Sequence, residues 1–173
     1  VKVCEKIGIE HHVIDYRDIF KETVINKFIN DYNSGITPNP CILCNREVKF
    51  NFLYHNMLKY DCDYIATGHY ARIIDGKLFK SSDLNKDQTY FLYRLSSETL
   101  SKVRFPLANL KKSEVFDLAN KANLFAATRK ESQDFIGEEY FDMLFSDKES
   151  IPGNIIDLDG NILGKHRGIE HYT

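Results

Sequence analysis

Apolar residues recur every three to four positions in several stretches of the chain, a spacing that places them on one face of a helix. Gly35 is expected to end the first such helix and Asn45 to cap the second. The helices are predicted over residues 17–35, 45–60, 86–95 and 113–124. The repeating apolar positions are Phe20, Val24, Phe28 and Tyr32, then Phe52, Leu53 and Met57, then Val115, Leu118, Ala119 and Ala122.

Other stretches have the pattern of strands. Residues 8–15 are predicted as a short strand, and residues 62–74 as a buried strand broken by Gly68. Asp-Gly pairs predict hairpins at residues 75–76 and within residues 154–165, where the hairpin is interpreted as the start of a separate β domain. The order strand, helix, helix, strand is typical of an α/β fold, whose open, mostly parallel sheet carries functional loops at the strand ends.

Composition narrows the class of protein. The chain has 173 residues, 43% of them hydrophobic, with 12 Phe and 10 Tyr, which is enough to bury a core. The formal charge of -2 gives no overall basic character for nucleic acid, although a local basic patch remains compatible with it. No apolar run could span a bilayer, and the Val1 start and Thr173 end indicate a fragment.

A Cys-x-x-Cys motif at Cys41 and Cys44 follows Pro38 and Pro40. Prolines restrict the backbone, so this loop would hold its thiols in place before a substrate arrives. The Cys44 thiol is expected near a helix start, where its pKa would be lowered and the reactive thiolate favoured. The alternative is half of a zinc site completed by Cys62 with His55 or His69, for which no second motif of ligand spacing exists.

Two further polar stretches could carry chemistry. Gly68 and His69 follow a predicted strand, where a backbone could approach a ligand, although a Gly-His pair also suits a simple turn. Lys86, Asp87 and Gln88 lead into an apolar stretch and could be either recognition residues or a solvated helix start. Cys4 and Cys62 are expected to be small buried residues.

Five segments, in this order and spacing, resemble the tRNA-specific 2-thiouridylases: TPNPCILCNREVKF, DYIATGHYARI, NKDQTYFLYRL, RKESQDFIGEEYF and IPGNIIDLDGNILGKHRGIEHYT. The resemblance covers essentially the whole chain. It implies a partial, Rossmann-like PP-loop ATP-pyrophosphatase domain over residues 1–83. It also implies a mainly helical, tRNA-binding central domain over residues 84–150 and the start of a C-terminal β-barrel over residues 151–173.

The resemblance also implies an activity. Enzymes of this family use ATP, expected with Mg²⁺, to adenylate the C2 oxygen of the wobble uridine, and a cysteine persulfide then delivers sulfur to C2. Cys44 corresponds to the nucleophile, and Gly68 to a backbone contact with ATP. The residues expected to bind the target base are Asn39, Pro40 and Cys41. Those expected to contact the tRNA elsewhere are His69, Lys86, Asp87 and Gln88.

The implied partners are tRNAs with glutamate, glutamine or lysine anticodons and a protein that donates persulfide sulfur, with no membrane. A cytoplasmic location is expected from the absence of targeting signals, and a mitochondrial enzyme without its leader would have the same sequence features.

The chain departs from the family pattern at three points. The glycine-rich SGGxDS loop that binds ATP phosphates is absent, and the Ile-Cys pair expected between Asp134 and Phe135 is missing, either lost or dropped from the sequence. Cys41 stands where many members have Asp, so it could form a reversible disulfide with Cys44, or both could ligate an iron–sulfur cluster. Two rival hypotheses follow: a metal- or cluster-binding module, and a non-catalytic tRNA-binding relative.

Overall fold

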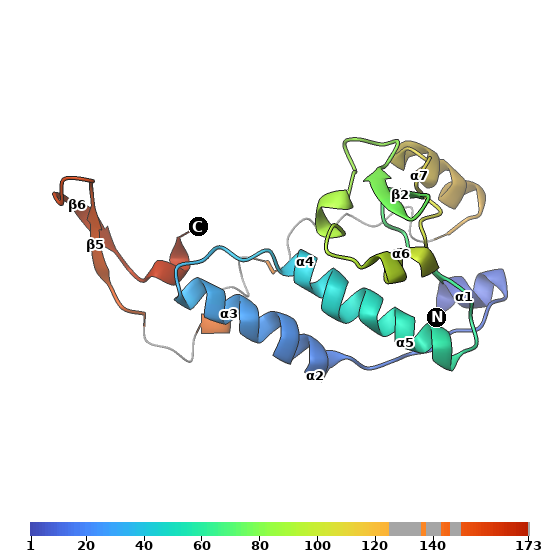
Figure 1. Ribbon diagram of the computed structural model, residues 1–173, viewed down its shortest axis with the longest axis horizontal. Helices are drawn as coiled ribbons and strands as arrows, with labels where there is room; N and C mark the ends of the chain where they lie inside the picture. Colours follow the sequence, from blue (N-terminus) through green and yellow to red (C-terminus); the bar gives the residue numbers. More distant parts are fainter. Residues whose placement is uncertain (125–135, 138–142, 146–149, 173) are drawn as a thin grey trace. The chain divides into compact units, whose positions relative to one another are not determined.

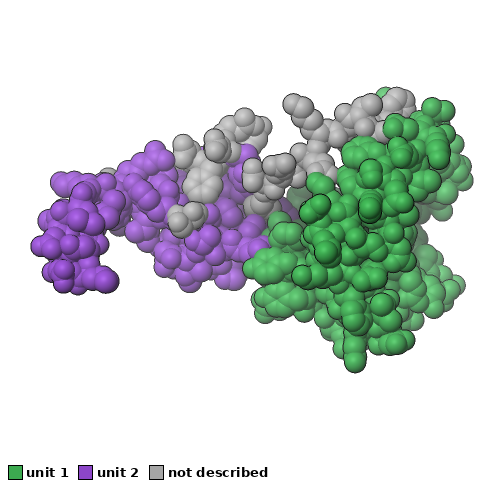
Figure 2. All heavy atoms as spheres, turned by 90° about the horizontal axis from the view of Figure 1, so that it is seen from above, with its two compact units in different colours: residues 1–17, 41–132 green, residues 18–40, 133–173 purple. Residues whose placement is uncertain are grey.

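The computed structural model describes residues 1–124, 136–137, 143–145 and 150–172. It divides into two compact units (Figure 2), each considered by itself below. Unit 1 comprises Val1–Arg17 and Cys41–Ser132, and unit 2 comprises Asp18–Pro40 and Gln133–Thr173. The domain boundaries expected at residues 83 and 150 stay a prediction. Among the described helices, none has the length and apolar character needed to cross a membrane.

One continuous helix begins at Pro40 and ends at Lys59, as Figure 1 shows. It consists of α4 (Pro40–Leu43), the π-helical segment η2 (Cys44–Phe50) and α5 (Asn51–Lys59). Proline suits the first turn of a helix, where its missing N–H would have no partner. The predicted helix is therefore confirmed, but the prediction that Asn45 caps it is wrong, because Asn45 lies inside the helix and is only 3% exposed.

The strands of unit 1 form a parallel pair and a hairpin. β1 (Ile65–Ala66) pairs in parallel with β4 (Val103–Arg104). β2 (Ala71–Ile74) and β3 (Lys77–Lys80) pair antiparallel around Asp75 and Gly76, whose φ angles of 50° and 72° suit a two-residue turn. This arrangement of helices and parallel strands confirms the predicted α/β class and the hairpin.

The described part of unit 1 also contains α1 (Lys2–Ile7), the 3₁₀ turn η3 (Thr89–Phe91), α6 (Ser97–Lys102) and α7 (Lys112–Lys121). α7 confirms the helix predicted over residues 113–124. The helix predicted over residues 86–95 is wrong beyond the short η3, because the Asp87 carboxylate accepts the N–H groups of Ser81 and Thr89 and holds this region as a turn.

Residues 9–16 form no strand, so the strand predicted over residues 8–15 is wrong. A strand needs a hydrogen-bonding neighbour, and no described residue pairs with this stretch. Its apolar side chains Ile9, Val13 and Ile14 are exposed.

The core of unit 1 joins the long helix to the strands. Phe50 and Val103 are fully buried, and Leu92 is 1% exposed. The cluster consists of Phe50, Met57, Ile65, Ala71, Leu92, Val103 and Phe105. It fixes the Cys44-bearing helix against the loop that follows β1.

Unit 2 contains the first predicted helix, apart from its first residue Arg17, and the second predicted hairpin. The helix runs through α2 (Arg17–Phe20), η1 (Lys21–Ile25) and α3 (Asn26–Asn33), and Gly35 follows it with a φ of 71°. β5 (Gly153–Ile156) and β6 (Ile162–His166) pair antiparallel, followed by the 3₁₀ turn η5 (Ile169–His171). Both predicted elements are confirmed, while the β-barrel stays a prediction.

Candidate functional site

The candidate nucleophile Cys44 begins η2 and is half-buried. Burial raises the pKa of its thiol, the nearby Lys49 ammonium lowers it, and Cys41 raises it further, with a net increase. The predicted lowering of this pKa is therefore wrong. Because the helix begins at Pro40 rather than at Asn45, the thiol lies inside it, where desolvation outweighs the helix dipole.

The four cysteines of the chain are free thiols, so Cys41 and Cys44 form no disulfide in this structure. Cys62 is exposed, which corrects the expectation that it is buried. Among the residues that the structure describes, no group of three or more His, Cys, Asp and Glu side chains could hold a metal ion.

The buried Asn45 is a functional candidate that the sequence interpretation missed. Its amide oxygen has no hydrogen-bond partner among the described residues. Buried polar atoms are nearly always paired, so an orphaned acceptor next to the candidate nucleophile is unusual. The predicted role of Asn45 as a helix cap already explained its polar side chain, so no further function was expected of it.

His69 lies in the loop between β1 and β2, against the Cys44-bearing helix. Its Nδ1 atom forms a 2.8 Å hydrogen bond with Thr67 Oγ1. Its ring centroid is 5.6 Å from that of Phe50 and 6.0 Å from that of Phe105. Burial, assisted by the Lys49 charge, lowers the pKa of His69 to about 4, so the imidazole is neutral at pH 7 and can donate one hydrogen bond and accept another.

We expect the His69 ring to stay neutral down to about pH 5 and to titrate with a pKa near the lowered value of about 4. Because this folded-state pKa lies below the ordinary value of 6.5, the folded state loses stability as the pH falls from 6.5 towards 4. Histidine ring resonances followed by NMR against pH would measure this, with His69→Gln identifying the signal. A midpoint near 6.5 would contradict the buried placement of the ring.

Gly68 is exposed, and nothing in the described fold requires a glycine there. A Cβ atom at this position would meet only Leu107 Cδ1, at an ordinary contact distance of 3.8 Å. A glycine that folding does not require fits a backbone approached closely by a ligand. The role of Gly68 as an ATP contact stays a prediction.

The structure brings Asp87 and Gln88 next to this loop. Gln88 Oε1 accepts the N–H of Tyr70 at 3.0 Å, and the Gln88 N–H donates to the Tyr70 carbonyl at 2.9 Å. Burial disfavours the charged form of Asp87, but hydrogen bonds from Thr89 and Ser81 outweigh it and lower the carboxyl pKa. Gln88 therefore supports the end of the loop of Gly68 and His69, whereas Asp87 holds the turn between Ser81 and Thr89. Their role as tRNA contacts stays a prediction.

Some of the remaining predicted residues belong to unit 2, and others lie outside the described residues. Asn39 and Pro40 belong to unit 2, where Asn39 is exposed and Pro40 begins α4. Their joint role with Cys41 in binding a base stays a prediction. Asp134 and Phe135, which flank the missing cysteine, lie outside the described residues.

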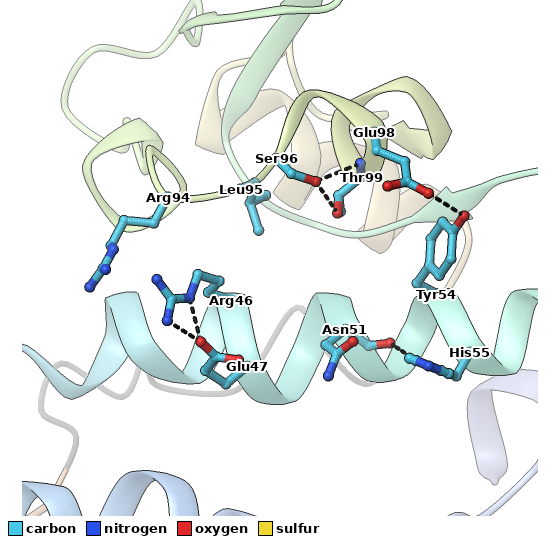
Figure 3. Close-up of a pocket in the computed structure, with 10 residues that line it drawn as sticks. All are labelled: Arg46, Glu47, Asn51, Tyr54, His55, Arg94, Leu95, Ser96, Glu98 and Thr99. Carbon is cyan, nitrogen blue, oxygen red and sulfur yellow. Dashed lines mark hydrogen bonds and ion pairs between the residues drawn. The ribbon is translucent and has the colours of Figure 1, made fainter.

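The described part of unit 1 also contains two grooves that the sequence did not predict, and of the candidate residues named above only His55, from the zinc alternative, lines one of them. The larger, of about 460 Å³, lies between β2 and residues 103–109. The other, of about 380 Å³, lies between the long helix and residues 94–99 (Figure 3). Its lining residues are Arg46, Glu47, Asn51, Tyr54, His55, Arg94, Leu95, Ser96, Glu98 and Thr99.

Comparison with known proteins gives consistent results. Residues 1–138 match the family model described as the tRNA methyl transferase HUP domain. Over 99% of its length the chain is 42% identical to tRNA-specific 2-thiouridylase MnmA 1 of Fusobacterium nucleatum and 44% identical to MnmA of Acetivibrio thermocellus, covering 49% and 51% of these relatives. It is 42% identical to MnmA of Bacillus subtilis over its whole length, covering 48% of that protein.

The chain thus spans about half the length of the curated relatives it matches. The similarity extends across all five segments that resemble the 2-thiouridylases, which confirms that resemblance. The chain belongs to the tRNA methyl transferase HUP-domain family, together with these tRNA-specific 2-thiouridylases.

Proposed function

We propose that this chain is part of an ATP-dependent tRNA 2-thiouridylase that adenylates the wobble uridine and transfers persulfide sulfur to its C2 atom. The family and the names of its relatives support this proposal. The observation that carries it is the contact between Phe50 and His69, 5.6 Å between ring centroids. Through this contact the helix that carries Cys44 meets the loop of Gly68 and His69, which supports a site built from both segments.

Each residue has a role in the proposed reaction. Cys44 is the nucleophile and must lose its proton before it can react, because the thiolate is the reactive form. The neutral His69 ring contacts the RNA through hydrogen bonds, and Gly68 lets ATP approach the backbone. ATP, when bound, supplies the adenylyl group that turns the C2 oxygen of uridine into a leaving group.

The target uridine must leave the anticodon stack for its C2 atom to reach the half-buried thiol of Cys44. Asn39, Pro40 and Cys41 would receive the base, and the restricted backbone of the two prolines would hold that surface ready for it. Lys86, Asp87 and Gln88 would contact the tRNA next to the loop that Gln88 supports. The partners are a tRNA with a glutamate, glutamine or lysine anticodon and a protein carrying a persulfide.

The full-length protein, incubated with an unmodified glutamate tRNA transcript, ATP, Mg²⁺, a protein carrying a persulfide and a thiol that reduces the S–S bond as sulfur is released, should form 2-thiouridine. Nucleoside analysis by liquid chromatography and mass spectrometry would detect the exchange of oxygen for sulfur. The product should be absent when ATP is omitted, because an unactivated C2 oxygen is a poor leaving group. An ATP-independent product, or no product with any of the three tRNAs, would contradict the proposal.

A further inference from the structure

The groove in Figure 3 has opposite charges at its two ends. Arg46 and Arg94 lie towards one end, and Glu98 with Tyr54 towards the other. Polar side chains of Asn51, Ser96 and Thr99 line the space between them. Its volume of about 380 Å³ is in the range of small-molecule sites, which begins at about 300 Å³.

At the cationic end, the two arginines differ in their partners. Arg46 Nε donates a 2.5 Å hydrogen bond to Glu47 Oε1, so most of its charge is compensated. Arg94 is exposed, and no described residue forms an ion pair or hydrogen bond with it. Its guanidinium can therefore donate paired hydrogen bonds to an external anion, which for a planar fork is best a phosphate or a carboxylate.

At the opposite end, the Glu98 carboxylate accepts the hydroxyl of Tyr54 at 3.0 Å through Oε1. The hydrogen bond uses one of the two carboxylate oxygens, and an ionised carboxylate has capacity for further donors. A ribose hydroxyl or the amino group of a base is a suitable donor. The rings of Tyr54 and His55, 6.2 Å apart at 79°, add aromatic surface of the kind that contacts bases.

We propose that this groove binds one nucleotide of the RNA substrate, with its phosphate on Arg94 and a hydroxyl or amino group on Glu98. The proposal rests on the proposed function, which supplies an RNA as the ligand. The groove is separate from the thiol, because Arg46 follows Cys44 by two positions on the helix and therefore faces nearly the opposite side. It would position the RNA without taking part in the chemistry.

The test compares Arg94→Gln with Arg17→Gln in the full-length protein. Both changes remove one exposed positive charge, but Arg17 lies outside the groove and pairs with Asp15. For Arg94→Gln we expect about tenfold weaker tRNA binding, and a slope of log affinity against log salt that is lower by about one. Arg17→Gln should bind tRNA as the wild type does.

Measuring the ATP affinity of the same proteins shows whether the nucleotide bound in the groove belongs to the tRNA or is ATP. Unchanged ATP affinity in Arg94→Gln, with weakened tRNA binding, would assign the groove to RNA. Weakened ATP binding with unchanged tRNA binding would overturn the proposal, as would tRNA affinity and salt slope equal to those of Arg17→Gln. If the wild type forms 2-thiouridine while Arg94→Gln binds tRNA normally, the proposed role of the groove fails and the proposed function stands. If the wild type does not bind tRNA, the role of the groove and the proposed function both fail.

Discussion

Replacing Cys44 by serine in the full-length protein is expected to reduce the formation of 2-thiouridine by more than about a hundredfold. Serine is close to cysteine in size, so the half-buried position in η2 should tolerate it without a change of fold. Its hydroxyl, however, ionises far less readily than a thiol and cannot exchange sulfur with a persulfide. Nucleoside analysis of the reacted tRNA measures the loss.

Binding of tRNA by Cys44→Ser should remain within about twofold of the wild type, since the substitution removes no charge at neutral pH and replaces a weakly hydrogen-bonding thiol by a hydroxyl of similar size. Cys62→Ser is the matched control, because Cys62 is an exposed thiol of the same unit. It should leave thiolation unchanged. Retained thiolation in Cys44→Ser, or equal losses in both variants, would remove Cys44 from the role of nucleophile.

The elements predicted best are those specified by local sequence. The helices at residues 17–35 and 45–60 carry long apolar stripes, and the two Asp-Gly turns need only the backbone freedom of their own residues. The two wrong elements depend on distant or competing partners. Residues 8–15 have a strand pattern without a neighbouring strand, and the Asp87 side chain overrides the helical pattern that follows it.

In the candidate site, too, local motifs could be predicted from the sequence, whereas contacts between distant residues could not. Sequence motifs identified Gly68, His69 and Gln88 separately, but only the fold shows that Gln88 bonds the backbone of Tyr70 next to His69. The direction of the Cys44 pKa could not be predicted, because burial of a thiol depends on packing between segments. The groove was missed for a related reason: its two walls, residues 46–55 and 94–99, lie about 40 positions apart and match no motif.

Replacing Phe50 by alanine is expected to lower the free energy of unfolding by about 3 to 5 kcal/mol. The Phe50 side chain is 0% exposed, and its ring packs against His69 and, at 6.3 Å between centroids, against Phe105. Truncation removes this buried area and leaves a cavity at the junction of the helix and the strands. Urea unfolding of the variant and the wild type measures the difference.

Leu53→Ala is the control on the same helix, since Leu53 is 37% exposed and should cost far less than Phe50. A loss of under about 1 kcal/mol in Phe50→Ala would contradict the described core.

A second measurement, of the His69 pKa in Phe50→Ala, connects this packing to the site. Because burial is the main cause of the low His69 pKa, water entering the cavity should raise that pKa towards 6.5. If Phe50→Ala destabilised the fold yet left His69 unchanged, Phe50 would support the core but not the loop, and the link between the Cys44 helix and His69 would have to come from other contacts.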